Sequence, residues 1–162
     1  MDPQRPPPKS KPKAELSPAG RALRLLARRE HTRRELEVKL GPHVEDPEEL
    51  QALLDDFTAR GWLSEARAVA QVVNSKRDRM GAARIRHALR QRGAPEDLIA
   101  SAVQGLRDTE LDRARAVWGR KFSTPPADAA ERARQVRFLQ ARGFSVEVAL
   151  RVLRGKGRDS GE

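Results

Sequence analysis

The 162-residue sequence contains no cysteine and no tyrosine, only four phenylalanines and two tryptophans, and no long apolar run. Without cysteine there can be no disulfide, cysteine-liganded zinc site or thiol nucleophile, and a reducing compartment is expected. So few rings argue against a stacking platform for single-stranded bases. No segment approaches the roughly 20 apolar residues of a membrane span, and the N-terminus lacks the apolar block of a signal peptide. We therefore expect a soluble, cytoplasmic protein with no membrane contact.

Residue groupings that support enzyme chemistry are also missing. The three histidines, His31, His43 and His87, lie in separate segments without metal-ligand spacing, and each is interpreted as a surface or turn residue. The glycines are isolated rather than gathered in a phosphate-binding loop. Asp55 and Asp56 are adjacent on an expected helix, so they point in different directions and cannot form a two-metal cluster. We expect no catalytic residue, no metal and no cofactor, and hence no enzyme.

Positive charge is what the sequence has in excess. It carries 33 Lys+Arg against 23 Asp+Glu, which gives a net charge of +10 and a sequence pI near 11.0. Such an excess favours a polyanionic partner, and nucleic acid is the first candidate. Because aromatic residues are scarce, any contact with nucleic acid is expected to be weak and mainly with phosphates.

Helix-capping signals recur along the chain, whereas no segment alternates apolar and polar residues as a strand would. Ser17 and Pro18 predict one helix start. Thr32 followed by Glu35 predicts a second, in which hydroxyl and carboxylate each satisfy a backbone N–H across the turn. The arginine-rich stretch at 22–40 is therefore predicted to form two helices that meet at a corner near His31.

The same reading gives nine helices in three groups of three, and the predicted fold is all-α. Three tandem three-helix repeats, resembling helix-turn-helix units, are expected to form an elongated, curved molecule. Thr109 is predicted to open the first helix of the third group, and Trp62 and Trp118 are interpreted as packing residues. The predicted organisation is a disordered basic tail at 1–16, repeats at 17–61, 62–107 and 108–154, and a disordered tail at 155–162.

An internal similarity supports this grouping. The segment HALRQRGAPEDLIASAV at 87–103 aligns without a gap to RFLQARGFSVEVALRVL at 137–153, with a shared Arg-Gly helix end and apolar stripe. A repeated unit of this kind predicts modules that pack mainly on their neighbours.

Basic residues recur in each expected repeat, while acidic residues concentrate at helix starts, where the helix dipole favours them. We expect the corner near His31 to carry net positive charge, with only Glu30 and Glu35 opposing it, and the basic residues to form a stripe along the long axis. Base-specific recognition by the corner is poorly supported, because it offers few side chains that pair with base edges. The candidate binding residues are Arg28, Arg29, Arg33, Arg34, Lys76, Arg77, Arg79, Arg84, Arg86, Arg90, Arg92, Arg134, Arg137 and Arg142.

Four stretches resemble one known family, the RecX regulators of the RecA recombinase. They are ALRLLARREHTRRELEVKL at 22–40, RGWLSEARAVAQVVNSK at 60–76, GAARIRHALRQRGAP at 81–95 and RFLQARGFSVEVALRVL at 137–153. The resemblance implies three tandem three-helix repeats. It also implies that the chain binds RecA and the RecA–DNA filament, lies in the filament groove, and inhibits ATP hydrolysis, strand exchange and coprotease activity.

Two readings of function follow. The first is a monomeric, non-catalytic modulator of the RecA filament in DNA repair, recombination and the SOS response. The alternative is a stand-alone, nonspecific DNA-binding protein that contacts phosphates through a basic helical face. The sequence leaves open whether RecA or DNA contacts dominate, and whether inhibition occurs by capping a filament end or by occupying its groove.

Overall fold

The computed structural model describes residues 15–155, which form nine α-helices and two short 3-10 helices and contain no strand. The prediction of an all-α fold is confirmed. The predicted disordered tails, except for residues 15, 16 and 155, lie outside the described residues. Within the described range, no helix is long and apolar enough to cross a membrane.

The N-terminal group of helices, called repeat 1, packs around seven buried apolar side chains that include Leu36, Leu54 and Phe57. Gly61 has a φ of +74° and turns the chain after the last helix, so that Leu63 also enters this core. The elements of repeat 1 are α1 (Pro18–Arg28), α2 (Arg33–Leu40), the 3-10 helix η1 (Gly41–His43) and α3 (Pro47–Ala59).

The middle group, repeat 2, has its own core, in which Ile85, Leu89 and Ile99 are almost fully buried. Its elements are α4 (Glu65–Lys76), α5 (Ala82–Gln91), α6 (Glu96–Leu106) and the 3-10 helix η2 (Arg107–Thr109). The C-terminal group, repeat 3, packs Trp118, Leu139 and Phe144 in a third core. Its elements are α7 (Glu110–Lys121), α8 (Ala129–Ala141) and α9 (Val146–Gly155).

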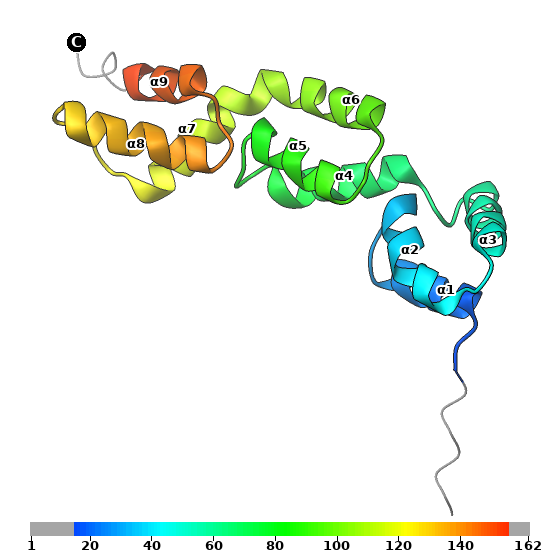
Figure 1. The fold of residues 1–162 in the computed structure, drawn as a ribbon. Helices are drawn as coiled ribbons and strands as arrows, with labels where there is room; N and C mark the ends of the chain where they lie inside the picture. The colour runs from blue at the N-terminus through cyan, green and yellow to red at the C-terminus, as the bar shows by residue number, and fades with distance from the viewer. Residues whose placement is uncertain (1–14, 156–162) are drawn as a thin grey trace, which may run out of the picture.

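The three repeats lie in a row, with repeat 1 and repeat 3 at opposite ends and repeat 1 turned away from the line of the other two (Figure 1). Each buried cluster draws its side chains from one group of helices, with Leu63 as an addition from the following turn. The molecule is therefore elongated and curved, built from three small cores rather than one large core. The repeat boundaries expected from the sequence stay predictions.

Most helix starts follow the capping signals in the sequence. The hydroxyls of Ser17, Thr32 and Ser64 accept backbone N–H groups from the first turns of α1, α2 and α4, as does the carboxylate of Asp46 in α3. Thr109 departs from this pattern, because its hydroxyl donates to the Leu106 carbonyl instead of capping α7. The helix start predicted at Thr109 is confirmed, because Thr109 is the N-cap residue and α7 begins at Glu110, although no side-chain bond caps the helix after the 3-10 turn.

The two tryptophans differ in their environments. Trp118 is 2% exposed and its indole N–H donates to the Gln135 side chain at 2.8 Å, so its interpretation as a packing residue is confirmed. Trp62 is 44% exposed, with its ring against Phe57 and below the Arg60 guanidinium. Trp62 therefore packs on the core residue Phe57 from outside, while Leu63, and not Trp62, enters the core.

Candidate functional site

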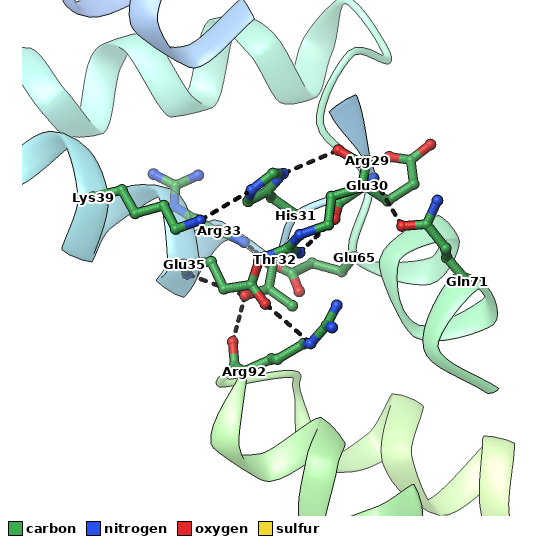
Figure 2. A network of polar contacts seen from close by, with 10 residues as sticks. All are labelled: Arg29, Glu30, His31, Thr32, Arg33, Glu35, Lys39, Glu65, Gln71 and Arg92. Atoms are coloured by element: carbon green, nitrogen blue, oxygen red, sulfur yellow. Dashed lines mark hydrogen bonds and ion pairs between the residues drawn. The ribbon is translucent and has the colours of Figure 1, made fainter. Parts of the chain in front are cut away.

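The contact between repeats 1 and 2, called the first joint, is a network of hydrogen bonds around the corner that precedes α2 (Figure 2). The Thr32 hydroxyl donates to the Arg92 carbonyl at 2.5 Å, and the Arg33 backbone N–H donates to a Glu65 carboxylate oxygen at 2.7 Å. The Glu30 N–H donates to the Gln71 side chain at 2.9 Å. Residues of repeat 1 are thus tied to two helices of repeat 2.

Ion pairs at the first joint change the charge balance expected from the sequence. Glu35 pairs with Arg29 at 2.8 Å and with Arg92 at 3.5 Å, so it does not close the reciprocal cap on Thr32. Arg33 pairs with Asp55 at 2.7 Å and with Glu37 at 3.6 Å. The expectation that only Glu30 and Glu35 oppose the positive corner is wrong, because folding brings carboxylates from elsewhere in α2 and from α3 to the arginines.

The Glu65 carboxylate lies in the same joint, and its two oxygens have different surroundings. One carboxylate oxygen accepts the Arg33 N–H, while the other is buried without a hydrogen-bond partner among the described residues. Burial raises the pKa of Glu65 above its usual value. The carboxylate thus fixes the start of α2 against the start of α4 at some cost in desolvation.

His31 was interpreted as a surface or turn residue. It lies in the turn between α1 and α2, but it is buried there, with 2% exposed. Its Nδ1 lies 3.0 Å from the Arg29 carbonyl and its Nε2 lies 3.4 Å from the Lys39 ammonium. A neutral ring with the proton on Nδ1 satisfies both contacts, since Lys39 can only donate. Burial lowers the pKa of His31 more than the hydrogen bond to the Arg29 carbonyl raises it. The positive charges of Arg29 and Lys39 lower it further, against the opposing charge of Glu35.

This environment predicts a stability loss in mild acid. The pKa of His31 in the folded protein lies below its ordinary value of 6.5, so the unfolded chain binds this proton first and stability falls as the pH drops below about 6.5. In His31→Gln we expect a smaller loss of unfolding free energy between pH 7.5 and pH 5.5 than in the unaltered protein, measured by urea titration. His87→Gln, at an exposed site on α5, should retain the full loss. An equal loss in all three proteins would contradict the assignment.

The contact between repeats 2 and 3, called the second joint, uses the same two kinds of acceptor as the first joint, a backbone carbonyl and a glutamate carboxylate. The Gly81 N–H donates to the Arg142 carbonyl at 2.7 Å, as the Thr32 hydroxyl does to Arg92. The Ala82 N–H donates to the Glu110 carboxylate at 3.2 Å, as the Arg33 N–H does to Glu65. In both joints, the start of the second helix of one repeat contacts the Arg-Gly turn and the first helix of the next. Two similar joints explain how the row is held together.

The side chains at the second joint differ from those at the first joint. They line a cavity of about 510 Å³, and none of the lining residues is acidic. We call it the basic cavity. It lies between the turn after α4, the start of α5, the end of α7 and the end of α8. Its lining consists of Arg79, Met80, Arg84, Val117, Arg120, Lys121, Phe138 and Arg142.

The four arginines of the basic cavity contact carbonyl groups or an aromatic ring, and none of them forms an ion pair with a carboxylate of the described residues. Arg84 donates to the Ala141 carbonyl at 2.8 Å, Arg79 donates to the Ser75 carbonyl at 3.2 Å, and Arg120 donates to the Asp78 carbonyl. The Arg142 guanidinium lies 4.3 Å from the centroid of the Phe138 ring. Such contacts orient the guanidinium groups but leave their charge uncompensated, so the cavity can accept an anionic group such as a phosphate.

The binding residues predicted from the sequence fall into three groups: those in the basic cavity, those in ion pairs, and those dispersed elsewhere. Arg79, Arg84 and Arg142 lie together in the basic cavity, and Arg120 and Lys121 join them although the sequence reading missed both. The signal for these two residues is the Gly-Arg-Lys run at the end of α7, where two adjacent cations follow the apolar stripe. Six other candidates carry ion pairs: Arg29, Arg33, Arg34, Arg90, Arg92 and Arg134.

The remaining candidates are dispersed. Arg28 lines a separate hollow in repeat 1, and Arg86 lines another cavity together with Glu110. Lys76 and Arg77 are half-buried at the end of α4, and Arg137 is exposed on α8. The basic cavity is therefore where several candidates meet without acidic neighbours. In the part of the chain that the structure describes, no group of acidic and histidine residues could hold a metal ion.

Comparison with known proteins places the chain among regulatory proteins. A family model described as the third three-helix domain of RecX matches residues 108–153. The regulatory protein RecX of Leptothrix cholodnii is 56% identical over 140 residues, which cover 86% of this chain and 89% of that protein. That of Ralstonia nicotianae is 45% identical over 144 residues, which cover 89% and 91%. These names denote a regulatory protein and no class of enzyme.

Solved structures support the fold. The crystal structure of RecX from Lactobacillus salivarius superposes with a TM-score of 0.75 at 14% identity, covering 85% of this chain and 93% of that one. A second crystal structure, described as regulatory protein RecX, gives a TM-score of 0.69 at 20% identity and covers 83% and 70%. At these identities the likeness concerns the arrangement of helices.

Proposed function

Because this chain belongs to the RecX family of regulatory proteins, we propose that it binds RecA and the RecA–DNA filament and inhibits ATP hydrolysis, strand exchange and coprotease activity. Regulation of DNA repair and recombination would then follow from binding alone, without covalent chemistry by this chain. The observation that carries the proposal is the basic cavity, which gathers five cations without an acidic neighbour at the joint between two repeats.

The shape of the molecule suits a helical filament. A row of three small repeats can place several weak contacts along a groove, and linked contacts add through effective concentration. The basic cavity supplies the contact with a phosphate of the bound DNA or with an acidic patch of RecA, and its charge also speeds encounter with an anionic surface. At the first joint, the ion pairs Arg92–Glu35 and Arg67–Glu30 run between repeats 1 and 2 and hold them in register instead.

The experiment replaces two cations of the cavity that do not tie the repeats together. We expect Arg79→Glu combined with Lys121→Glu to require at least tenfold more protein for half inhibition of RecA ATP hydrolysis on single-stranded DNA. The double change leaves three cations and adds two anions, so an anionic partner would be repelled. The measurement is a titration of steady-state ATP hydrolysis at fixed salt.

A matched control is available on repeat 3. Arg132→Glu combined with Arg151→Glu makes the same change in net charge at two exposed arginines outside the basic cavity. This control should inhibit at the same concentration as the unaltered protein. Unchanged inhibition by the cavity variant, or equal weakening of both variants, would count against the cavity as the contact surface.

The basic cavity also supports a second candidate, a protein that binds DNA nonspecifically without RecA. If all five cations contact phosphates of duplex DNA, the logarithm of affinity should fall with the logarithm of salt concentration with a slope of about −4.5. This candidate further requires that RecA leave the affinity unchanged. Co-sedimentation with RecA filaments on single-stranded DNA, compared with naked DNA at the same salt, distinguishes the two.

A further inference from the structure

Repeat 1 carries a second hollow, of about 320 Å³, that is separate from the basic cavity. It lies along α1 where that helix faces the end of α2 and η1. We call it the leucine pocket. Its apolar lining is Leu16, Leu25 and Leu40, and its other lining residues are Arg21, Arg24, Arg28, Lys39 and His43.

The rim of the leucine pocket carries uncompensated positive charge. Arg21, Arg24 and Arg28 have side chains without a hydrogen bond or ion pair among the described residues, in contrast to Arg29 and Arg33 nearby. Helix α1 itself has no acidic residue, and none lines the pocket. Three guanidinium groups therefore stand around an apolar floor, and no acidic side chain among residues 15–155 pairs with them.

The floor and the rim together restrict what could bind. A free anion would satisfy the arginines but would leave the leucines uncovered, whereas a purely apolar group would leave the charges unpaired. The chain's own N-terminal residues do not complement the rim, because residues 1–14 contain Arg5, Lys9, Lys11 and Lys13 against a single acidic residue. The complementary ligand is a peptide that carries both carboxylates and a leucine-sized side chain.

We propose that the leucine pocket binds an acidic segment of a protein partner, with an apolar side chain of the segment on Leu25 and Leu40 and its carboxylates on the arginines of α1. The apolar contact supplies affinity that survives salt, and the carboxylate contacts fix the orientation of the segment. This inference goes beyond the proposed function and does not rest on it, because the pocket can be tested without RecA or DNA.

The probe is a fluorescent eight-residue peptide with two central leucines and three glutamates on each side. Fluorescence anisotropy with the full-length protein should show saturable binding at moderate salt. A second peptide with serines in place of the leucines should bind at least tenfold more weakly. Arg24→Glu combined with Arg28→Glu should weaken binding of the leucine peptide at least tenfold, since both side chains are exposed on the rim.

Two controls distinguish loss of the site from loss of the fold. The variant pair Arg132→Glu and Arg151→Glu has the same charge change and should bind the leucine peptide as the unaltered protein does. Circular dichroism and urea unfolding should show that the Arg24 and Arg28 variant is folded. If that variant does unfold, neutral Arg24→Gln with Arg28→Gln replaces it and should weaken binding at least threefold.

Four outcomes would overturn the proposal. The first is no saturable binding of the leucine peptide, and the second is equal binding of the serine peptide, which would remove the role of the apolar floor. The third is that a single-stranded oligonucleotide of the same charge fully displaces the leucine peptide, and that the Arg24 and Arg28 variant does not bind this oligonucleotide. The leucine pocket would then be a nucleic-acid site. The fourth is that the unaltered protein sediments as a dimer and the Arg24 and Arg28 variant sediments as a monomer. The ligand of the pocket would then be the acidic segment 45–49 of a second copy.

Discussion

Gly81→Ala is expected to destabilise the protein by about 1–3 kcal/mol, the usual cost of forcing atoms into a packed interface. A Cβ atom on Gly81 would lie 2.4 Å from both the carbonyl carbon and the oxygen of Gly143 and 2.6 Å from the Phe144 nitrogen. All three are backbone atoms, so no side chain can swing aside. The φ of Gly81 is −79°, which alanine adopts freely, so the penalty arises from the second joint and not from the backbone of α5.

The measurement is urea unfolding together with the radius of gyration from small-angle scattering. The first reports the loss of stability, and the second reports any opening between repeats 2 and 3. Gly105→Ala in α6 is the matched control, because nothing lies within 4 Å of its added Cβ. That substitution should stabilise the protein by about 0.5–1 kcal/mol through its effect on helix propensity. Destabilisation of the same size by both substitutions would mean that the close approach at Gly81 does not matter.

Arg113→Met is expected to cost about 3 kcal/mol, since it leaves buried carbonyl groups without a partner. Arg113 is 8% exposed, and one of its terminal nitrogens donates to the carbonyls of Arg77 and Met80, both at 2.8 Å. It also donates to the Leu106 carbonyl and the Thr109 hydroxyl. A side chain of repeat 3 thus satisfies carbonyls at the ends of two helices of repeat 2.

The control for this substitution lies two residues further along the same helix. Arg115→Met removes an exposed guanidinium that pairs with Asp112 at 3.3 Å, and exposed pairs of this kind contribute little. We expect a change within about 0.5 kcal/mol for Arg115→Met by urea unfolding. Burial lowers the pKa of Arg113, but the ordinary pKa of arginine is so high that this side chain stays charged at neutral pH. Equal effects of the two substitutions would show that the buried contacts contribute nothing.

Much of the fold follows from local signals in the sequence. Ser17, Thr32, Asp46 and Ser64 mark helix starts because each satisfies an N–H only two or three residues away, an interaction that needs no distant partner. The apolar stripes between these caps then fix which face of each helix is buried. The aligned segments at 87–103 and 137–153 form equivalent helix pairs, each with an Arg-Gly turn in which glycine has a positive φ.

The candidate site was predicted less well, for a physical reason. From its sequence neighbours alone, Arg33 is expected to have no ion-pair partner in α3. Its partner Asp55 lies on that helix and comes close only when α2 and α3 pack together. The same reading of sequence neighbours missed Arg120, which joins Arg84 only because α7 crosses the turn after α4 at the second joint. Whether an arginine is compensated depends on residues distant in the sequence, and capping and periodicity carry no information about them.

The sequence by itself determined nine helices, their grouping by threes and a large excess of positive charge. These properties depend on capping, periodicity and composition, each of which acts over a few residues. Only the tertiary structure decided which charges are neutralised at the first joint and which remain open in the basic cavity and the leucine pocket. The reason is that the Coulomb energy depends on separations in space, and those separations are set by how the repeats pack on one another.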